Sequence, residues 1–374
     1  MIYFDNAATS LIKPKIVKIS VIEAVNNFTA NPGRSGHLKS VQTAEKIFKT
    51  REKIKAFFNA ENYSLVFTKN CTEALNLAIQ GFLKKGDHVI TTCYEHNSIL
   101  RPLMSLKNIG VEVTILNCDL KDFAIQVQSE IKGNTKMVIS TYVSNVTGDV
   151  CDIEKVNDIC KKYNITYLVD GAQACGHVKI DLTKVNIDML AFAGHKGMLS
   201  ITGVGGLLVK DLSKLNPVLK GGTGTVSENL VQPKAYEEDF EAGTIPSISI
   251  ISLGAGVDFL NKNFKFILEK EHKLSKYLYN SLEKLKFLEM YSNVNSLNVF
   301  TFNIKGLDSS MVANVLNEKY KIAVRAGMHC APLIHKKLGT EKFGAVRISL
   351  DYNNEFYEID FLIKALKEIA NRDI

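Results

Sequence analysis

Residues 164–173 read Asn-Ile-Thr-Tyr-Leu-Val-Asp-Gly-Ala-Gln, residues 189–196 read Met-Leu-Ala-Phe-Ala-Gly-His-Lys, and these two stretches decide the fold. Each starts as a short apolar run typical of a buried strand and ends in polar residues. We therefore expect Asp170 and Lys196 at the carboxyl ends of neighbouring strands, which is the edge where open α/β sheets bind ligands.

Lys196 and Asp170 together indicate pyridoxal phosphate (PLP) chemistry. A lysine amine forms a Schiff base with an aldehyde, and a carboxylate facing it keeps a pyridinium nitrogen protonated. Taken singly, an Asp that closes a strand is often a helix cap, and a Lys in a loop is usually a solvated charge. The order strand, Asp-Gly-Ala-Gln, strand, Gly-His-Lys favours the functional interpretation.

The same alternation of apolar runs and amphipathic stretches predicts a large α/β domain. Strands are expected at 65–68, 88–93, 111–116, 137–142, 166–169, 189–192 and 206–209, and helices near 72–83, 97–108, 122–132 and 152–163. Repeated βα units imply a mostly parallel seven-stranded sheet that is covered by helices on both faces.

The last third of the chain predicts a smaller α+β domain. A long lysine- and leucine-rich stretch, 249–285, predicts helices that leave the sheet domain, and beyond it we expect strands at 299–304 and 345–350 and helices at 309–319 and 355–370. The expected division is a large domain of residues 15–255 and a small domain of residues 1–14 and 256–374, with a cleft between them.

Composition excludes several classes of protein. With 374 residues, 46% hydrophobic and 23% charged, the chain is typical of a soluble globular protein. The net charge of +7 is spread without a basic tract, so we expect no nucleic-acid binding. The amino terminus lacks a signal-peptide pattern and no segment is long enough to span a bilayer, so neither secretion nor membrane insertion is expected. Seven cysteines without a Cys-x-x-Cys pair favour reduced thiols in a cytoplasmic protein and no metal site.

Three further candidates follow predicted strands. Thr72 lies where a strand enters a helix, so it and the backbone N–H groups could bind a phosphate, although an ordinary N-cap is equally expected. His96 could stack on a pyridine ring and move protons, or it could be a structural histidine. Asn145 could reach the ring hydroxyl or the substrate, or it could simply form a turn.

Residues 325–332 read Arg-Ala-Gly-Met-His-Cys-Ala-Pro and present a cysteine in a predicted loop. We expect His329 and Arg325 to give Cys330 thiolate character, because nearby positive charge stabilises the anion. A cysteine elsewhere would more often be an inert buried hydrophobe.

With these motifs, the chain resembles the class V aminotransferase family of fold type I PLP enzymes, and within it the cysteine desulfurases and selenocysteine lyases with a short cysteine loop. The resemblance covers essentially the whole chain and rests on residues 3–9, 31–37, 95–96, 170–173, 194–196, 240–244, 325–332 and 346–349.

The resemblance implies a role for each candidate residue. Lys196 would be the Schiff-base lysine, Asp170 would pair with the pyridine nitrogen and Gln173 would contact the ring oxygen. The remaining cofactor contacts would come from Cys71, Thr72, His96, Asn145 and His195, with Thr244 supplied by the neighbouring subunit of a homodimer. Substrate contacts would come from Asn145, Arg325 and Arg347, with Arg347 clamping the carboxylate and Cys330 accepting the sulfur.

Two features depart from many relatives. Ala193 stands where a Ser or Thr is common, which removes one phosphate hydroxyl, and the short cysteine loop often goes with a dedicated sulfur-acceptor protein. The expected activity is conversion of L-cysteine to L-alanine with transfer of sulfur to an enzyme persulfide. Selenocysteine lyase activity, transamination, another β-elimination and a noncatalytic scaffold remain alternatives.

Overall fold

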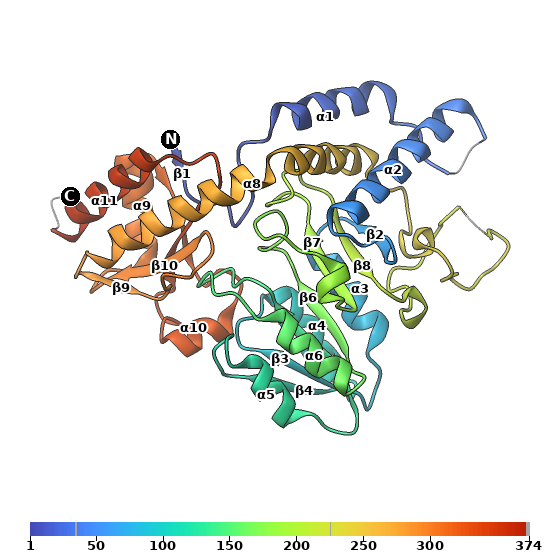
Figure 1. Cartoon of the computed structure of the whole chain (residues 1–374), viewed down its shortest axis with the longest axis horizontal. Helices are drawn as coiled ribbons and strands as arrows, with labels where there is room; N and C mark the ends of the chain where they lie inside the picture. The colour runs from blue at the N-terminus through green and yellow to red at the C-terminus, as the bar shows by residue number, and fades with distance from the viewer. Residues whose placement is uncertain (34–35, 225, 372–374) are drawn as a thin grey trace.

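A seven-stranded sheet forms the larger part of the computed structural model, which describes residues 1–33, 36–224 and 226–371 (Figure 1). Its strands are β2 (Ser64–Thr68), β3 (His88–Thr92), β4 (Glu112–Leu116), β5 (Thr135–Thr141), β6 (Thr166–Asp170), β7 (Met189–Ala193) and β8 (Gly205–Val209). Their order is β2-β8-β7-β6-β5-β3-β4, and β8 runs antiparallel to both of its neighbours, whereas β3 to β7 pair in parallel. The predicted large, mostly parallel sheet is confirmed.

Helices cover both faces of this sheet and explain its apolar strands. Strands β3, β6, β7 and β8 are buried along their whole length, as strands between two helical layers must be. Successive residues face two separate cores, with Tyr167 and Val169 in one and Leu168 in the other. The connecting helices are α3 (Cys71–Phe82), α4 (Asn97–Lys107), α5 (Phe123–Glu130), α6 (Ile153–Lys162) and α7 (Leu182–Val185). The four predicted helices are confirmed.

A 37-residue helix, α8 (Ser247–Glu283), connects the two parts of the molecule (Figure 1). Its first half packs against α1 (Lys15–Asn27) and α2 (Leu38–Phe57). A Cβ on Gly254 would lie 2.9 Å from the Thr50 hydroxyl, and one on Gly256 would lie 2.3 Å from the Met198 carbonyl oxygen. These glycines thus permit close packing without ending the helix. The predicted boundary at residue 255 falls inside α8, and the division into two domains stays a prediction.

The smaller part is built on an antiparallel sheet of four strands, ordered β12-β13-β10-β9. These are β9 (Leu288–Met290), β10 (Val299–Ile304), β12 (Arg325–Gly327) and β13 (Ala345–Ser349), accompanied by α9 (Ser309–Tyr320), α10 (Pro332–Leu338) and α11 (Phe356–Ala370). The amino-terminal strand β1 (Ile2–Tyr3) pairs in parallel with β11 (Ile322–Ala323), so the start of the chain lies in this part. Two 3-10 turns complete the elements, η1 (Leu212–Lys214) and η2 (Glu237–Phe240).

Residues 34 and 35 of the 31–37 motif lie outside the described residues. Among the helices of the described ranges, none combines the length and the apolar character that crossing a membrane requires.

Candidate active site

One cavity of about 90 Å³ lies at the carboxyl ends of the sheet strands and collects most of the predicted site residues. Residues that follow β2, β3, β5, β6 and β7 line it, as expected for an α/β sheet. The predicted residues in its lining are Cys71, Thr72, His96, Asn145, Asp170, Gln173, His195 and Lys196. Ala193 also lines it, so a methyl group occupies the position at which many relatives are expected to carry a hydroxyl.

The N-terminus of α3 opens into this cavity. The Asn70 side chain caps the helix by accepting a hydrogen bond from Glu73 N at 2.9 Å, so a conventional N-cap is present. The Thr72 and Ser98 hydroxyls lie 2.7 Å apart and both line the cavity. A Cβ on Gly205 would come within 2.6 Å of the Asn70 carbonyl carbon, so only glycine lets β8 pass this close to the helix start. The cap does not exclude the predicted phosphate site, because the first N–H groups of a helix can still bind an anion at its N-terminus.

Asp170 is a buried carboxylate, only 4% exposed, at the end of β6. It accepts a hydrogen bond from Ala172 N at 2.9 Å, and the Cys71 thiol lies 3.5 Å from the same oxygen. Burial and the Asp170 charge raise the pKa of Cys71 well above its usual value, so Cys71 is a neutral donor. Asp170 can therefore offer its negative charge to a cationic group in the cavity.

Lys196 lies in the loop after β7 and lines the same cavity. Burial lowers the pKa of Lys196, Arg347 and Arg325 lower it further, and Asp170 partly opposes them. A lowered pKa increases the fraction of neutral amine, which is the form that attacks an aldehyde or accepts a proton.

The two cavity histidines are held as neutral rings. His96 caps α4, with its Nδ1 accepting from Ser98 N at 3.1 Å, and burial lowers its pKa. Burial and the charges of Lys196 and Lys13 lower the pKa of His195 to about 4. Both rings line the cavity, so they can contact a bound molecule through stacking or hydrogen bonds.

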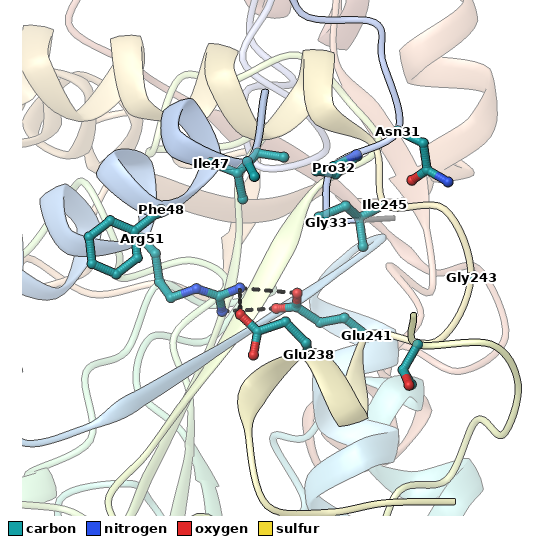
Figure 2. Close-up of a pocket in the computed structure, with 12 residues that line it drawn as sticks. Asn31, Pro32, Gly33, Ile47, Phe48, Arg51, Glu238, Glu241, Gly243 and Ile245 are labelled. Atoms are coloured by element: carbon teal, nitrogen blue, oxygen red, sulfur yellow. Dashed lines mark hydrogen bonds and ion pairs between the residues drawn. The ribbon is translucent and has the colours of Figure 1, made fainter. Parts of the chain in front are cut away.

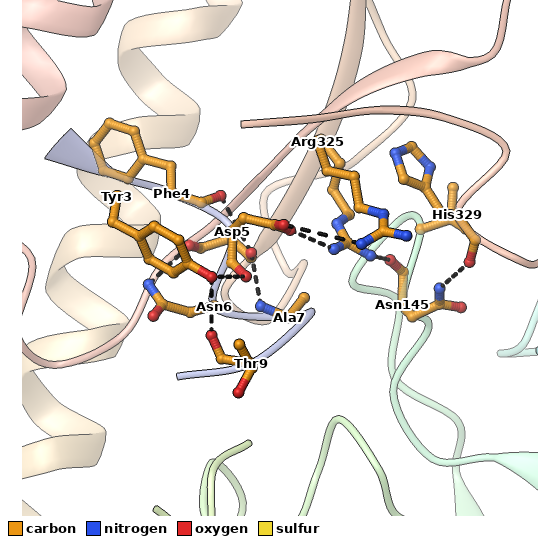
Figure 3. A network of polar contacts seen from close by, with 12 residues as sticks. Tyr3, Phe4, Asp5, Asn6, Ala7, Thr9, Asn145, Arg325 and His329 are labelled. Atoms are coloured by element: carbon orange, nitrogen blue, oxygen red, sulfur yellow. Dashed lines mark hydrogen bonds and ion pairs between the residues drawn. The ribbon is translucent and has the colours of Figure 1, made fainter. Parts of the chain in front are cut away.

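A polar network joins the cavity to the smaller part of the molecule (Figure 3). Arg347, on β13, donates to the Asn145 carbonyl oxygen at 3.0 Å and to Asp5 Oδ1 at 2.8 Å. The Asn145 side chain donates to the His329 carbonyl oxygen at 2.8 Å. Asn145 thus connects the cavity lining with Arg347 and with the residue that precedes Cys330.

Cys330 is an exposed thiol, whereas the other six cysteines are buried or partly buried. His329 and Cys330 both have left-handed backbone conformations, with φ values of 49° and 57°. The Cys330 carbonyl oxygen accepts a hydrogen bond from Asn97 N, beside His96, at 2.7 Å. Two successive non-glycine residues in this conformation are unusual and turn the loop sharply next to the cavity.

The expected contribution of His329 to a cationic loop is wrong. The His329 side chain is 5% exposed and packs on His335 with ring centroids 5.2 Å apart. Burial, Arg347 and His335 hold its pKa well below the usual value, so the ring is neutral near pH 7. Positive charge close to this loop therefore comes from the arginines, not from the histidine adjacent in sequence.

Thr244 is exposed and, like the predicted site residues Arg325, Arg347 and Cys330, it is not in the lining of this cavity. It follows Gly243 beside a second cavity of about 190 Å³ (Figure 2). There, Arg51 forms a buried bidentate ion pair with Glu241, at 2.9 and 3.0 Å, and Glu241 also accepts from Phe67 N at 2.7 Å. The ion pair fixes the start of the Thr244 segment to helix α2, and the hydrogen bond from Phe67 N fixes it to strand β2.

Sequence reasoning missed three polar residues at or beside the site. Asp5 pairs with Arg347, Ser98 contacts both Thr72 and His96, and Glu95 is fully buried next to His96. Burial raises the pKa of Glu95 to about 8. Asp5 and Glu95 lie inside stretches 3–9 and 95–96, so their positions in these motifs were the available signal.

Comparisons with known proteins agree with this fold. The family model described as Aminotransferase class-V matches residues 2–362. The probable cysteine desulfurase of Methanothermobacter thermautotrophicus is 33% identical over 380 residues, covering 99% of this chain and 94% of that protein. The probable cysteine desulfurase of Pyrococcus abyssi is 35% identical over 392 residues, covering 99% and 94%.

Solved structures show the same similarity. The apo structure of cysteine desulfurase from Thermococcus onnurineus NA1 has a TM-score of 0.91 and 32% identity, covering 99% of this chain and 94% of that chain. The cysteine desulfurase CsdA of Escherichia coli, in an S-sulfonic acid form, has a TM-score of 0.87 and 26% identity, covering 100% and 95%. Given the family match, the sequence relatives and the shared fold over nearly the full length, the chain belongs to the class V aminotransferase family, in the group that contains the cysteine desulfurases.

Proposed function

We propose that this protein is a PLP-dependent cysteine desulfurase that converts L-cysteine to L-alanine and carries the released sulfur as a persulfide on Cys330. One observation supports this most strongly. Asn145 lines the cavity that contains Lys196 and Asp170, and it also hydrogen-bonds both Arg347 and the residue before Cys330. On this proposal, Lys196, Asp170, Arg347 and the exposed Cys330 thiol would act on one substrate, because Asn145 connects the segments that carry them.

The residues of the cavity fit PLP. Asp170 is a buried anion with the charge that a pyridinium nitrogen needs, and the N-terminus of α3 with Thr72 suits a phosphate. Gln173 and His96 would contact the ring, while His195 would lie near the phosphate. When bound, PLP supplies an aldehyde that condenses with amines and a ring that withdraws electrons from the substrate Cα.

Lys196 and Arg347 would act on the amino acid. Its lowered pKa suits Lys196 to accept the substrate Cα proton, because a neutral amine is the basic form. Arg347 would bind the substrate carboxylate with its planar guanidinium and so fix the orientation of Cα and Cβ. The neutral His96 ring would cover one face of the site and help to exclude water.

Cys330 would take the sulfur. Its thiolate attacks the substrate sulfur, an S–S bond forms, and the Cβ–S bond breaks with its electron pair remaining on Cβ. Protonation of Cβ then yields alanine, and the sulfur stays on Cys330. An exposed thiol on a turned loop suits this step, because the persulfide must afterwards reach an acceptor protein or thiol.

A homodimer completes the proposal. Thr244 is exposed and outside the cavity of its own chain, so it can contribute to a phosphate site only through a second copy. The seven cysteines, all within the described ranges, are unpaired, which supports a reducing, cytoplasmic setting. L-selenocysteine remains an alternative substrate because it would use the same residues.

The test is incubation of the purified, PLP-loaded protein with L-cysteine, with and without a reductant, while alanine and sulfide are measured. We expect alanine in both cases, about one equivalent per site without reductant and continued turnover with it, because a reductant removes the persulfide. Pyruvate and ammonia as the products would instead indicate β-elimination, and a lack of alanine would reject the proposal.

A further inference from the structure

The amino-terminal segment after strand β1 contacts the loop that carries Lys196. Four donors of this segment lie near the His195 carbonyl oxygen, namely Ser10 N at 3.2 Å, Ser10 Oγ at 3.0 Å, Thr9 Oγ1 at 3.2 Å and Lys13 Nζ at 2.9 Å. Ser10 Oγ also lies 3.1 Å from the Lys196 carbonyl oxygen, and Lys13 Nζ donates to Ser10 Oγ at 2.6 Å. The backbone around the lysine is therefore held by residues that are far away in the sequence.

The His195 carbonyl oxygen has two lone pairs, so it cannot accept from all four donors at once. Ser10 N and the Lys13 ammonium can only donate, and together they use both lone pairs. The Thr9 hydroxyl can donate instead to Nδ1 of the neutral His195 ring, which lies 3.1 Å away. The Ser10 hydroxyl, which accepts from Lys13, keeps its proton for the next carbonyl oxygen.

That next carbonyl oxygen belongs to Lys196, and its other donor is Leu199 N at 2.9 Å. Without the Lys13 ammonium, the Ser10 hydroxyl would donate to the His195 carbonyl oxygen, and the Lys196 carbonyl oxygen would retain one donor. The orientation of the Lys196 backbone therefore depends on Lys13 through Ser10.

The surrounding structure holds Lys13 in this position, although lysine side chains are usually solvated. Lys13 is half-buried, and the buried Pro14 that follows it is the N-cap of α1. Helix α1 packs along α8, which fixes the backbone on that side of Lys13. On the other side, the Tyr3 hydroxyl lies 3.1 Å from the Thr9 carbonyl oxygen (Figure 3). The contact with the His195 carbonyl oxygen is thus built into the fold.

The Lys13 side chain brings a positive charge to the end of β7. Burial lowers the pKa of Lys13 to about 8, and Asp351 opposes this effect, so the ammonium form predominates near pH 7. The charge of Lys13 in turn lowers the pKa of His195. Lys13 is therefore a cation close to the residue before Lys196, and it disfavours protonation of nearby groups.

We propose that Lys13 is a positioning residue for Lys196, and that its ammonium, through the His195 carbonyl oxygen and the Ser10 hydroxyl, fixes the loop that presents the Lys196 amine to the cofactor. The inference rests on the proposed function, in which that amine attaches to PLP. A loop held in this way keeps the amine buried, and burial is the largest cause of its lowered pKa. Lys13 thereby maintains the neutral, reactive form of Lys196.

Lys13→Met tests this, because methionine has a similar shape and lacks the ammonium. In the full chain freed of PLP, labelling with acetic anhydride over a range of pH, followed by mass spectrometry of the Lys196 peptide, measures the titration of this one amine. Its midpoint should move to higher pH in Lys13→Met, since a more solvated amine near one fewer cation holds its proton more strongly. The rate of PLP capture near pH 7, trapped with borohydride, should fall about tenfold, the effect of one charge-assisted hydrogen bond.

Two further variants serve as controls. Lys13→Arg, which keeps the charge and the donors, should stay close to the wild type in both measurements. Lys15→Met, which changes an exposed lysine at the start of α1, should have no effect on either. An unchanged Lys196 titration in folded Lys13→Met would mean that Lys13 has a purely structural role and would overturn the inference.

Ser10→Ala separates position from charge, also if Lys13→Met fails to fold. It keeps the Lys13 ammonium and removes the hydroxyl that donates to the Lys196 carbonyl oxygen, so the Lys196 titration should again move to higher pH. An unchanged titration in Ser10→Ala overturns the inference, because Lys13 would then act by its charge alone. That result in a protein whose wild type releases alanine from L-cysteine rejects the role of Lys13 only, whereas a wild type that binds no PLP rejects the proposed function.

Discussion

His329 and Cys330 are adjacent in the chain but meet opposite environments. The imidazole is buried against His335 and held neutral, and the thiol is exposed. The prediction that His329 adds positive charge beside Cys330 was wrong, because the pKa of a histidine depends on its burial. Burial results from packing that the local sequence does not reveal. The arginines of the site come instead from β12 and β13, two strands of the smaller part.

At this residue scale, Arg347→Ala should chiefly weaken substrate binding. Loss of a charge-assisted hydrogen bond to a carboxylate costs about 1.5 to 3 kcal/mol, which is about 10-fold to 150-fold in KM for L-cysteine. The absorbance of bound PLP should persist, because Asp170 and Lys196 are unchanged. Arg347→Lys should recover part of the loss through its charge. A rate with the wild-type dependence on cysteine concentration would place the carboxylate site elsewhere.

At the scale of elements, a buried cluster joins the loop after β6 to α8 and to the segment before β10. His177 Nδ1 lies 3.0 Å from Glu271 Oε2 on α8, and the Asn298 amide donates to the same oxygen at 2.7 Å. A Cβ on Gly197, next to Lys196, would lie 2.7 Å from the His177 ring. The cluster therefore supports the loop that carries the lysine.

This cluster predicts a pH dependence of stability. Burial lowers the pKa of His177, but Glu271 outweighs it, so the folded-state pKa is above the usual value of about 6.5. The stabilisation is then complete below the unfolded-state pKa and is lost as pH rises through the folded-state value. His177→Gln should lower the free energy of unfolding by about 1 to 3 kcal/mol near pH 6 and by less at pH 9.

Thermal unfolding between pH 6 and pH 9 would check this. The matched control is His272→Gln, which changes an exposed histidine next to Glu271 on α8. A difference between wild type and His177→Gln that does not shrink with rising pH would contradict the ion pair.

The fold was largely predictable because its strands are apolar runs buried between helices. All seven runs became strands of the large sheet, with ends within about two residues of the expected positions. Helices α1 and α2 were not expected, and their outward faces carry exposed Ile19, Ile22 and Phe48, which blurs the amphipathic pattern. The close packing of the single helix α8 requires glycines beside Thr50 and Met198, which are distant in sequence.

The site residues that follow a strand directly were predictable from the sequence. Contacts between residues that are far apart in the sequence were not. Asp170 and Lys196 follow adjacent strands, so their meeting follows from sheet topology. Asp5 approaches Arg347 only because the amino-terminal segment lies along β13. Such long-range pairing has no local signal in one sequence.

At the scale of the whole molecule, the position of Thr244 predicts that two chains build each site. Thr244→Ala should weaken PLP binding, and mixing it with Lys196→Ala should restore one complete site in each mixed dimer. Random exchange makes about half of the dimers mixed, so about a quarter of the sites should retain PLP and activity when the cofactor is limiting. If the mixture retains no more PLP and activity than the average of the two separate variants, Thr244 contributes to the site of its own chain or to no site.

The transfer of sulfur to Cys330 is the central claim, and mass spectrometry after treatment with L-cysteine tests it most directly. The wild type should gain one sulfur on the peptide that contains Cys330, and a partly buried control, Cys118→Ser, should do the same. Cys330→Ser should bind PLP and L-cysteine yet gain no sulfur, because a serine hydroxyl is too weakly acidic to attack sulfur. The account would be contradicted if Cys330→Ser released alanine at the wild-type rate and Cys330 of the wild type gained no sulfur.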